Sequence, residues 1–272
     1  MAGACQRIPS PLCSAIRRNG CGNTLLVVKL VKAGGAMDTL SRFNSDLDEF
    51  VKGRKFSPFD RIFQSCGRIW HIRRADMDRL WASMGADAGE GEERLPYWNE
   101  IWPSSLALAG WIAEMEDDIR GKKCLDMGCG LGFTALMGRW FGADVTGMDY
   151  EPEAIEYARL NAEENCIEGV EWKVEDWRKP TLPPESFDRI WAGDVMYEPA
   201  FAEPVAAFIR SMLKPEGKAW LAEPGREIFR VLLDELPAHH LSFRRICSLP
   251  ISPLTPQAVP VPVTIWELNR TA

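Results

Sequence analysis

Histidine is scarce in this sequence of 272 residues, which contains three histidines beside eight cysteines. The cysteines form no Cys-x-x-Cys pair and no histidine follows at ligand spacing, so the sequence predicts no metal site and no disulfide framework. Reduced thiols of this kind are typical of an intracellular protein. Long apolar runs are also missing, because the stretch from Leu25 to Val31 is short and contains Lys29. We therefore expect no membrane-spanning segment.

Positive charge is in short supply as well. The formal net charge is −7, whereas a nucleic-acid partner normally requires a basic face. We therefore expect no nucleic-acid partner. An acidic surface suits a protein partner that offers lysines, although it also simply favours solubility.

The first 36 residues contain no acidic residue, and they carry five basic ones. Removing that charge of +5 from −7 leaves −12 on the rest of the chain. The segment fits an organelle transit peptide, or a signal peptide cleaved near Ala33 to Ala36. It also fits a disordered leader or an overextended start before Met37, which we favour. The expected location is then cytoplasmic, and it is the mitochondrial matrix if residues 1–36 are a transit peptide.

The most informative stretch runs from Lys123 to Asp149. It predicts a short apolar strand, a glycine-rich turn, a helix over residues 133–140 and a second strand that ends at Asp149. Glycines at positions 128, 130 and 132 let the backbone turn sharply and approach a ligand closely. An acid at the end of the second strand can accept both hydroxyls of a ribose. The stretch therefore predicts a nucleoside-binding half of an α/β fold.

The glycine spacing argues against two common cofactor motifs. A dinucleotide fingerprint requires a small residue where this chain has Phe133, and the Gly-Lys-Ser/Thr ending of a P-loop is missing. The predicted ligand is therefore a nucleoside without a dinucleotide or triphosphate group.

The segment before residue 96 is predicted to be an accessory layer over residues 37–95. Helical spacing of apolar residues predicts helices over residues 38–52 and 75–84, with a strand over 69–72 between them and a loop over 85–93 after them. The main domain then occupies residues 96–272. Its first helix is predicted to begin at Pro103, which is favourable in a first helical turn, and to run to about Met115.

After Asp149 the pattern alternates between helices and strands. Helices are predicted over residues 151–164, 200–213 and 227–236, and strands over 170–174, 187–192, 218–222, 241–248 and 261–268. A proline-rich loop without a helix joins the last two strands, which predicts an antiparallel hairpin. The predicted fold is therefore a Rossmann-like seven-strand α/β sheet, mostly parallel, with helices on both faces.

Chemically useful residues follow the predicted strands. Asp176 and Trp177 come after the third strand, where an acid can accept from an adenine amino group and an indole can cover the ring. Gly193, Asp194 and Tyr197 follow the fourth strand, at the sheet edge where open α/β sheets bind ligands. The alternative interpretation is structural: Trp177 and Tyr197 belong to the core, and Asp194 caps a turn.

These stretches together resemble methyltransferase family 16, the class I (seven-strand) S-adenosylmethionine-dependent protein-lysine methyltransferases. They are similar in particular to the members that modify the electron-transfer flavoprotein β subunit. The resemblance covers residues 96–272 and is carried by three elements: Tyr97-Trp98 with Ile101-Trp102-Pro103, the loop Leu-Asp-Met-Gly-Cys-Gly-Leu-Gly over 125–132, and Asp194-x-x-Tyr197. It implies S-adenosyl-L-methionine as the cofactor and a monomeric enzyme. The implied substrate is a protein lysine, for example in the electron-transfer flavoprotein β subunit or in a ribosomal protein.

The resemblance also implies roles for residues at the matching positions. Asp194 and Tyr197 are expected at the substrate lysine, as the catalytic pair. Gly193 departs mildly from the family, in which alanine is frequent at this position. The matching positions that contact the cofactor are Trp102, Gly128, Cys129, Gly130, Asp149, Trp177 and Gly193. Asp126 of the loop motif and Asp176 after the third strand complete the residues expected to bind the cofactor.

Two other functions stay open at this point. A small-molecule N- or O-methyltransferase could use the same cofactor domain, because a fold does not fix a substrate. The shortage of histidines argues against a histidine base, and so against methylation of unactivated hydroxyl groups. A cofactor-binding scaffold without catalysis is the third interpretation.

Overall fold

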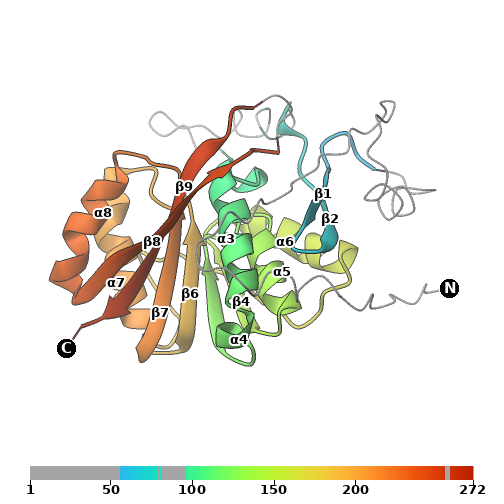
Figure 1. The fold of residues 1–272 in the computed structure, drawn as a ribbon. Coiled ribbons are helices and arrows are strands. Elements are labelled where there is room, and N and C mark those ends of the chain that lie inside the picture. The colour runs from blue at the N-terminus through green and yellow to red at the C-terminus, as the bar shows by residue number, and fades with distance from the viewer. Residues whose placement is uncertain (1–55, 79, 81, 83–95, 255–257, 272) are drawn as a thin grey trace.

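A mixed sheet of seven strands forms the centre of the computed structural model, which describes residues 56–78, 80, 82, 96–254 and 258–271 (Figure 1). The strands lie in the order β5-β4-β3-β6-β7-β9-β8. This confirms the predicted Rossmann-like seven-strand fold. Their bounds are β3 (Lys123–Met127), β4 (Asp144–Asp149), β5 (Glu171–Val174), β6 (Phe187–Gly193), β7 (Leu213–Glu223), β8 (Leu241–Ile251) and β9 (Val261–Arg270).

Strands β5, β4, β3, β6 and β7 pair in parallel, and only β9 runs antiparallel to its two neighbours, β7 and β8. The predicted C-terminal hairpin is therefore confirmed, with the last strand inserted between β7 and β8. The burial of the two strands agrees with this order: Val263, Ile265 and Leu268 of the inner strand β9 are buried, whereas most of β8 is exposed or half-buried at the sheet edge.

Helices cover both faces of the sheet. Alternate residues of β6 point to opposite faces: Trp191 packs with α3 and α5, while Ile190 and Ala192 pack with α7 and α8. Prolines at the first helical position begin α3 and α6, as the sequence predicted. The helix bounds are α3 (Pro103–Glu114), α4 (Glu116–Ile119), α5 (Phe133–Trp140), α6 (Pro152–Glu164), α7 (Ala202–Met212) and α8 (Phe229–Glu235). None of the helices in these described ranges has the length and hydropathy needed to cross a membrane.

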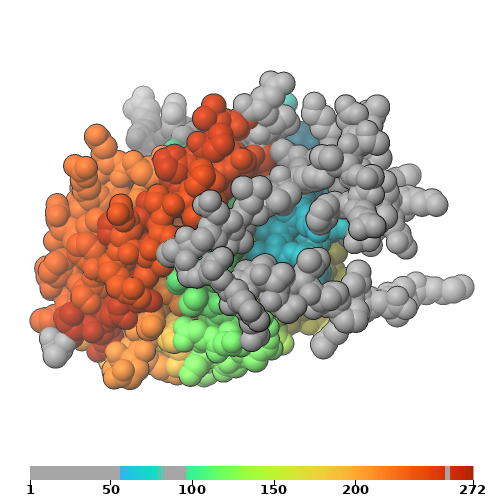
Figure 2. Space-filling model, in the orientation of Figure 1, coloured from blue at the N-terminus to red at the C-terminus, as the bar shows by residue number. Residues whose placement is uncertain are grey.

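A two-strand antiparallel sheet precedes the main domain and consists of β1 (Arg61–Ser65) and β2 (Arg68–Ile72). The sequence predicted β2 but missed β1, whose apolar core is only Ile62 and Phe63. The available signal was the link Cys66-Gly67, in which both residues have a positive φ (49° and 77°), as in the two-residue turns of tight hairpins. Phe63 and Trp70 of this hairpin belong to the same buried cluster as Val263 and Ile265 of β9. In Figure 2 the hairpin (cyan) lies near the middle of the face shown, with the C-terminal part of the chain (orange to red) to its left.

The remaining predictions for the N-terminal region are tested only in part. Residues 77, 78, 80 and 82 of the predicted helix over 75–84 are helical. The leader (1–36), the helix predicted over 38–52 and the loop over 85–93 lie outside the described residues.

Three buried asparagines attach the end of β2 to the main domain. At each of three positions in this segment, the backbone N–H and C=O both bind the side-chain amide of one asparagine. The pairs are His71 with Asn165, Arg73 with Asn161, and Ala75 with Asn99. The N–H to Oδ1 distances are 3.1, 2.7 and 2.8 Å, in the same order. Alternate residues of an extended segment present their backbone to one side. The amides therefore take the place of a neighbouring strand, and we call this set of bonds the amide clamp.

We expect Asn165→Asp to weaken the amide clamp selectively. The side-chain NH₂ group of Asn165 donates to the carbonyl oxygens of His71 (2.7 Å) and Asn161 (2.8 Å), so a carboxylate would face two buried oxygens. Chemical denaturation should show a loss of about 2–4 kcal/mol in the free energy of unfolding. Hydrogen exchange of the β1 and β2 amides should accelerate first.

The matched control is Asn269→Asp, which makes the same chemical change at a half-buried position of β9. It should change the free energy of unfolding by less than about 0.5 kcal/mol. Equal effects of the two substitutions would contradict the amide clamp as the attachment of the hairpin.

Candidate functional site

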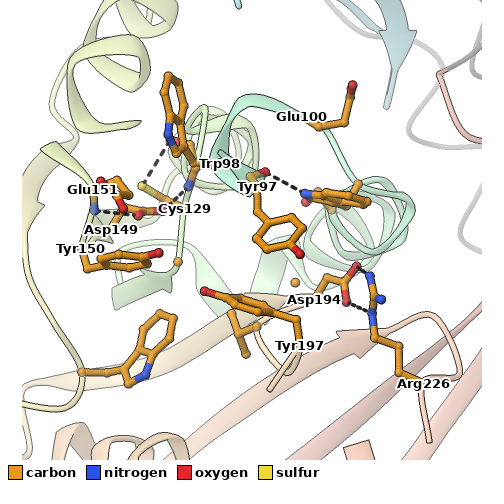
Figure 3. A pocket seen from close by; sticks show the side chains of 17 residues that line it. Tyr97, Trp98, Glu100, Cys129, Asp149, Tyr150, Glu151, Asp194, Tyr197 and Arg226 are labelled. Atoms are coloured by element: carbon orange, nitrogen blue, oxygen red, sulfur yellow. Dashed lines mark hydrogen bonds and ion pairs between the residues drawn. The ribbon is translucent and has the colours of Figure 1, made fainter. Parts of the chain in front are cut away.

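A pocket opens at the carboxyl ends of β3, β4 and β6, where the glycine loop forms one end of it (Figure 3). Asp149, the last residue of β4, accepts hydrogen bonds from the backbone N–H groups of Gly130 (2.9 Å) and Glu151 (3.1 Å). Burial raises the pKa of Asp149 to about 6. The two backbone bonds fix the carboxylate at the pocket wall, and its remaining lone pairs can accept hydroxyl groups of a ligand.

The glycine loop is closely packed from behind. Gly128 and Gly130 have positive φ angles of 70° and 49°. A Cβ atom on Gly130 would lie 3.0 Å from the backbone oxygen of Trp98, and one on Gly128 would lie 3.1 Å from Val195 Cγ1. Both backbone angles and space therefore favour glycine, and the loop lines the pocket without bulky side chains.

Aromatic rings line the pocket next to the glycine loop. Trp177 is 5% exposed and lies 6.2 Å from the Tyr150 ring and 5.8 Å from the Phe201 ring, centroid to centroid. Its ring N–H has no hydrogen-bond partner among the described residues. Trp177 is thus buried, as expected of a core residue, and it also forms a wall of the pocket, as expected of a residue that covers a ligand ring.

The other end of the pocket contains Asp194, which follows β6 with a left-handed φ of 56°. Its carboxylate binds the guanidinium group of Arg226 through two hydrogen bonds, Nε to Oδ1 at 2.8 Å and Nη2 to Oδ2 at 3.0 Å. Figure 3 shows this ion pair on one side of the pocket, Asp149 and Glu151 on the other, and Tyr97 and Tyr197 between them. The pocket therefore has two ends of different chemistry.

Two tyrosines form the middle of the pocket. The rings of Tyr97 and Tyr197 lie 5.0 Å apart, and Trp102 lies 6.1 Å from Tyr97. Burial raises the pKa of Tyr197, and the neighbouring Tyr150 raises it further. The phenol of Tyr197 therefore stays protonated at neutral pH, so it can serve as a wall or a hydrogen-bond donor but not as a base.

Two of the predicted cofactor residues lie away from the pocket lining. Asp126 is 1% exposed, and its carboxylate accepts a hydrogen bond from Thr134 Oγ1 (2.7 Å) at the start of α5. Alternation along β3 turns Asp126 toward α5, while Leu125 and Met127 pack on the α7 and α8 side. Asp176 binds Arg178, which lowers the pKa of Asp176. The other predicted residues line the pocket, and all the predicted roles stay predictions: Trp102, Gly128, Cys129, Gly130, Asp149, Trp177, Gly193, Asp194 and Tyr197.

The sequence gave no role to several residues that line the pocket. Arg226 follows the fifth parallel strand, β7, and the carboxyl ends of such strands share one edge, so its position was an available signal. Tyr150 and Glu151 directly follow Asp149, and Tyr97 was part of the quoted motif without a role of its own. The lining residues that the sequence missed are Tyr97, Glu100, Ser105, Tyr150, Glu151, Val195 and Arg226, whereas Trp98 and Trp102 belong to the stretch that was expected to cover the pocket.

The charges of the lining suit a cationic nucleoside better than a nucleotide. Among the described residues that line the pocket, Arg226 is the one lysine or arginine, and it is bound to Asp194. The lining carboxylates Asp149 and Glu151 contribute negative charge, whereas Glu100 is ion-paired with Arg74. The acid at the end of β4 and the loop free of bulky side chains, together with this charge, fit a nucleoside that carries positive charge and no phosphate.

Comparison with known proteins agrees with this geometry. A family described as a methyltransferase domain matches residues 119–248. The chain is 32% identical to the electron transfer flavoprotein beta subunit lysine methyltransferase of Xenopus laevis over 49% of this chain and 54% of that protein. It is 25% identical to the protein of the same name from Danio rerio over 74% of this chain and 73% of that protein. The first of these matches thus spans about half the length of the relative.

Other similar proteins have different names. A ubiquinone biosynthesis O-methyltransferase of Neisseria meningitidis is 32% identical over 39% of this chain and 45% of that protein. Among solved structures, a putative RNA methyltransferase of Pyrococcus horikoshii aligns with a TM-score of 0.53 at 15% identity, over 72% of this chain and all of that one. This likeness concerns the fold alone.

We expect Gly130→Ala to impair binding of S-adenosylhomocysteine, used as a stable cofactor analogue. The new Cβ would press on Trp98 at the pocket wall and would also strain a left-handed residue. Gly67→Ala is the matched control, because Gly67 also has a positive φ (77°) but has no atom within 4 Å of the Cβ position. Both variants should lose about 1–2 kcal/mol of stability. Only Gly130→Ala should weaken binding more than about tenfold by calorimetry, and equal affinities would contradict the role of the glycine loop.

We expect Asp126 to make the stability depend on pH. Burial raises the pKa of Asp126 to about 7, well above its ordinary value near 4, so the folded state retains a proton that the unfolded state has lost. The free energy of unfolding should therefore fall as the pH rises toward and through 7. Asp126→Asn should reduce the fall between about pH 5 and pH 8 by about 2–3 kcal/mol.

The control for this measurement is Asp144→Asn, at an exposed position of β4. It should leave the slope of stability against pH as in the unmodified protein. Asp149 titrates in the same window, so a smaller slope should remain in Asp126→Asn. A slope unaffected by Asp126→Asn would contradict the assignment.

Proposed function

Because the chain contains a class I S-adenosylmethionine-dependent methyltransferase domain, we propose that it is a protein-lysine N-methyltransferase. The proposal places the cofactor at the glycine-loop end of the pocket and the amine of a lysine side chain at the Asp194 end. The observation that carries it is the two-ended pocket, in which Asp149 and Asp194 lie on opposite sides of a pair of tyrosine rings.

Residues of β3, β4 and the loop after β5 would hold the cofactor. S-adenosylmethionine, when bound, supplies a methyl group on a positively charged sulfur. Asp149 would accept the ribose hydroxyls with the lone pairs left by its two backbone bonds. Trp177 would cover a ring face, and the backbone of the glycine loop would permit close contact. The carboxylates of the lining favour the cationic cofactor over its neutral product.

The lysine amine has to be uncharged at the acceptor end of the pocket before it can attack the methyl group. A free lysine has a pKa near 10.4, so only about one molecule in a thousand is neutral near pH 7. The rings of Tyr97, Tyr197 and Trp102 would desolvate the ammonium group, which lowers its pKa. Asp194 would orient the amine by hydrogen bonding, so that its lone pair is aligned for transfer. Tyr197 stays protonated and Asp194 is ion-paired, so neither would serve as the base, and the ammonium proton would pass to solvent water before the methyl transfer.

The names of the relatives support a lysine acceptor in a protein. Two of them are electron transfer flavoprotein beta subunit lysine methyltransferases, so that subunit is the first substrate to test. The location of the protein stays a prediction from residues 1–36.

A small-molecule methyltransferase is the second candidate. The likeness to a ubiquinone biosynthesis O-methyltransferase supports it, and so do the aromatic walls of the pocket, because stacked rings suit an aromatic acceptor. The two candidates differ in where the methyl group appears: in protein, or in the small-molecule fraction.

The test measures labelled methyl groups from S-adenosylmethionine, transferred by the purified protein into a whole-cell protein extract and into the purified flavoprotein subunit. We expect a discrete labelled protein band. Asp194→Ala should reduce the labelling about a hundredfold through loss of amine orientation. The matched control is Asp234→Ala, at an exposed position of α8, which should leave labelling unchanged.

Binding of S-adenosylhomocysteine to Asp194→Ala checks that this variant remains folded. Full labelling by a folded Asp194→Ala protein would refute the role of Asp194. Bound cofactor with no labelled protein would favour the small-molecule acceptor.

A further inference from the structure

Arg226 lies where the proposed acceptor would bind, although its positive charge should repel a lysine ammonium group. We propose that Arg226 is a positioning residue that keeps the acceptor amine uncharged by neutralising Asp194. This inference rests on the proposed function, which brings an amine to the Asp194 end of the pocket.

The ion pair engages both oxygens of the carboxylate. The side chain of Asp194 is 5% exposed, and each of its oxygens accepts one N–H from the same guanidinium group. The side chain of Arg226 is 41% exposed, so it covers the carboxylate on the solvent side. A guanidinium group stays charged at any physiological pH, so the pair is neutral as a whole.

The chain places Arg226 with several independent bonds. Glu223, at the end of β7, is 7% exposed and accepts the backbone N–H groups of Gly225 and Arg226. Gly225 has a φ of 81°, which turns the loop back toward the pocket. The backbone N–H of Asp194 donates to the carbonyl oxygen of Ala222 (2.9 Å), so the segments that carry the two charges are fixed to each other.

The charge of Asp194 decides the protonation state of a neighbouring amine. An unpaired carboxylate within about 4–6 Å stabilises an ammonium group and raises its pKa, which makes the neutral nucleophile still rarer. With Arg226 in place, this attraction is largely cancelled. Each oxygen of Asp194 still has a lone pair for an N–H of the amine. Asp194 can therefore orient the amine without holding its extra proton.

Arg226 is the charge partner of Asp194, because the neighbouring polar groups are uncharged or bound to other partners. Glu223 already accepts backbone N–H groups, and the carboxylate of Glu100 binds Arg74 at 2.7 Å. Tyr197 stays protonated because burial raises its pKa. The titratable and charged groups that face the pair or lie across the pocket are Tyr97, Glu100, Asp149, Tyr150, Glu151, Tyr197, Glu198 and Glu223.

The first test compares Arg226→Gln with Arg226→Lys over pH, using kcat and KM for the methylated protein. Gln removes the charge but keeps a hydrogen-bond donor, whereas Lys keeps the charge. For Arg226→Gln we expect a lower KM and an apparent pKa of kcat about one unit higher, which is a tenfold loss near neutral pH that recovers at alkaline pH. Arg226→Lys and the exposed control Arg230→Gln on α8 should retain the original profile.

A binding measurement tests the same inference without methyl transfer. The probe is n-butylammonium, added to the full chain loaded with S-adenosylhomocysteine and followed by nuclear magnetic resonance. Near pH 7, Arg226→Gln should bind the probe about tenfold more tightly than the unmodified protein. Equal binding, or a loss of kcat that is the same at every pH, would overturn the proposal.

The two experiments also separate this inference from the proposed function. If the unmodified protein methylates no protein, the proposed function fails, and the butylammonium measurement still decides whether Arg226 controls the charge of the site. If labelling occurs but Arg226→Gln changes neither the pH profile nor probe binding, only the role of Arg226 fails.

Discussion

The amide clamp is the constraint on which the geometry of the pocket depends. Asn161 of α6 binds Arg73 and also donates to the carbonyl oxygen of Leu131 in the glycine loop (3.0 Å). Asn99 binds Ala75 and directly follows Trp98, whose backbone oxygen lies 3.0 Å from the position that a Cβ atom on Gly130 would take. A buried amide without partners costs about 1–3 kcal/mol, so these bonds are hard to exchange for others. The N-terminal hairpin is therefore part of the pocket support rather than an appendage.

Charge is distributed along the pocket in a way that suits the proposed chemistry. Asp149 and Glu151 contribute negative charge at the glycine-loop end, where a cationic cofactor would lie. At the other end, the ion pair of Asp194 and Arg226 is neutral as a whole. A single pocket thus attracts a permanent cation at one end, and at the other end it does not stabilise an ammonium group that has to lose its proton.

The sequence predicted those features that local rules determine. Backbone geometry within a few residues determines the glycine positions, the strand ends and the helix starts at Pro103 and Pro152. The observed helices and strands agree with these predictions. The pairing of Asp194 with Arg226 joins positions 32 residues apart, so only the tertiary structure reveals it. Asn161 and Asn165 likewise look like ordinary residues at the end of a helix until β2 is placed beside them. The side chain of Asp126 points toward α5 because of the alternation along β3, whereas its predicted contact with the cofactor stays a prediction.

The identity of the methylated amino acid tests the proposed lysine chemistry most directly. Labelled protein from the transfer reaction would be hydrolysed to amino acids and separated by chromatography with mass detection. Our account predicts that the label is recovered in N-methylated lysine, since we propose that the Asp194 end of the pocket orients an uncharged amine. Label in another amino acid, in a base-labile ester or in the small-molecule fraction would contradict it.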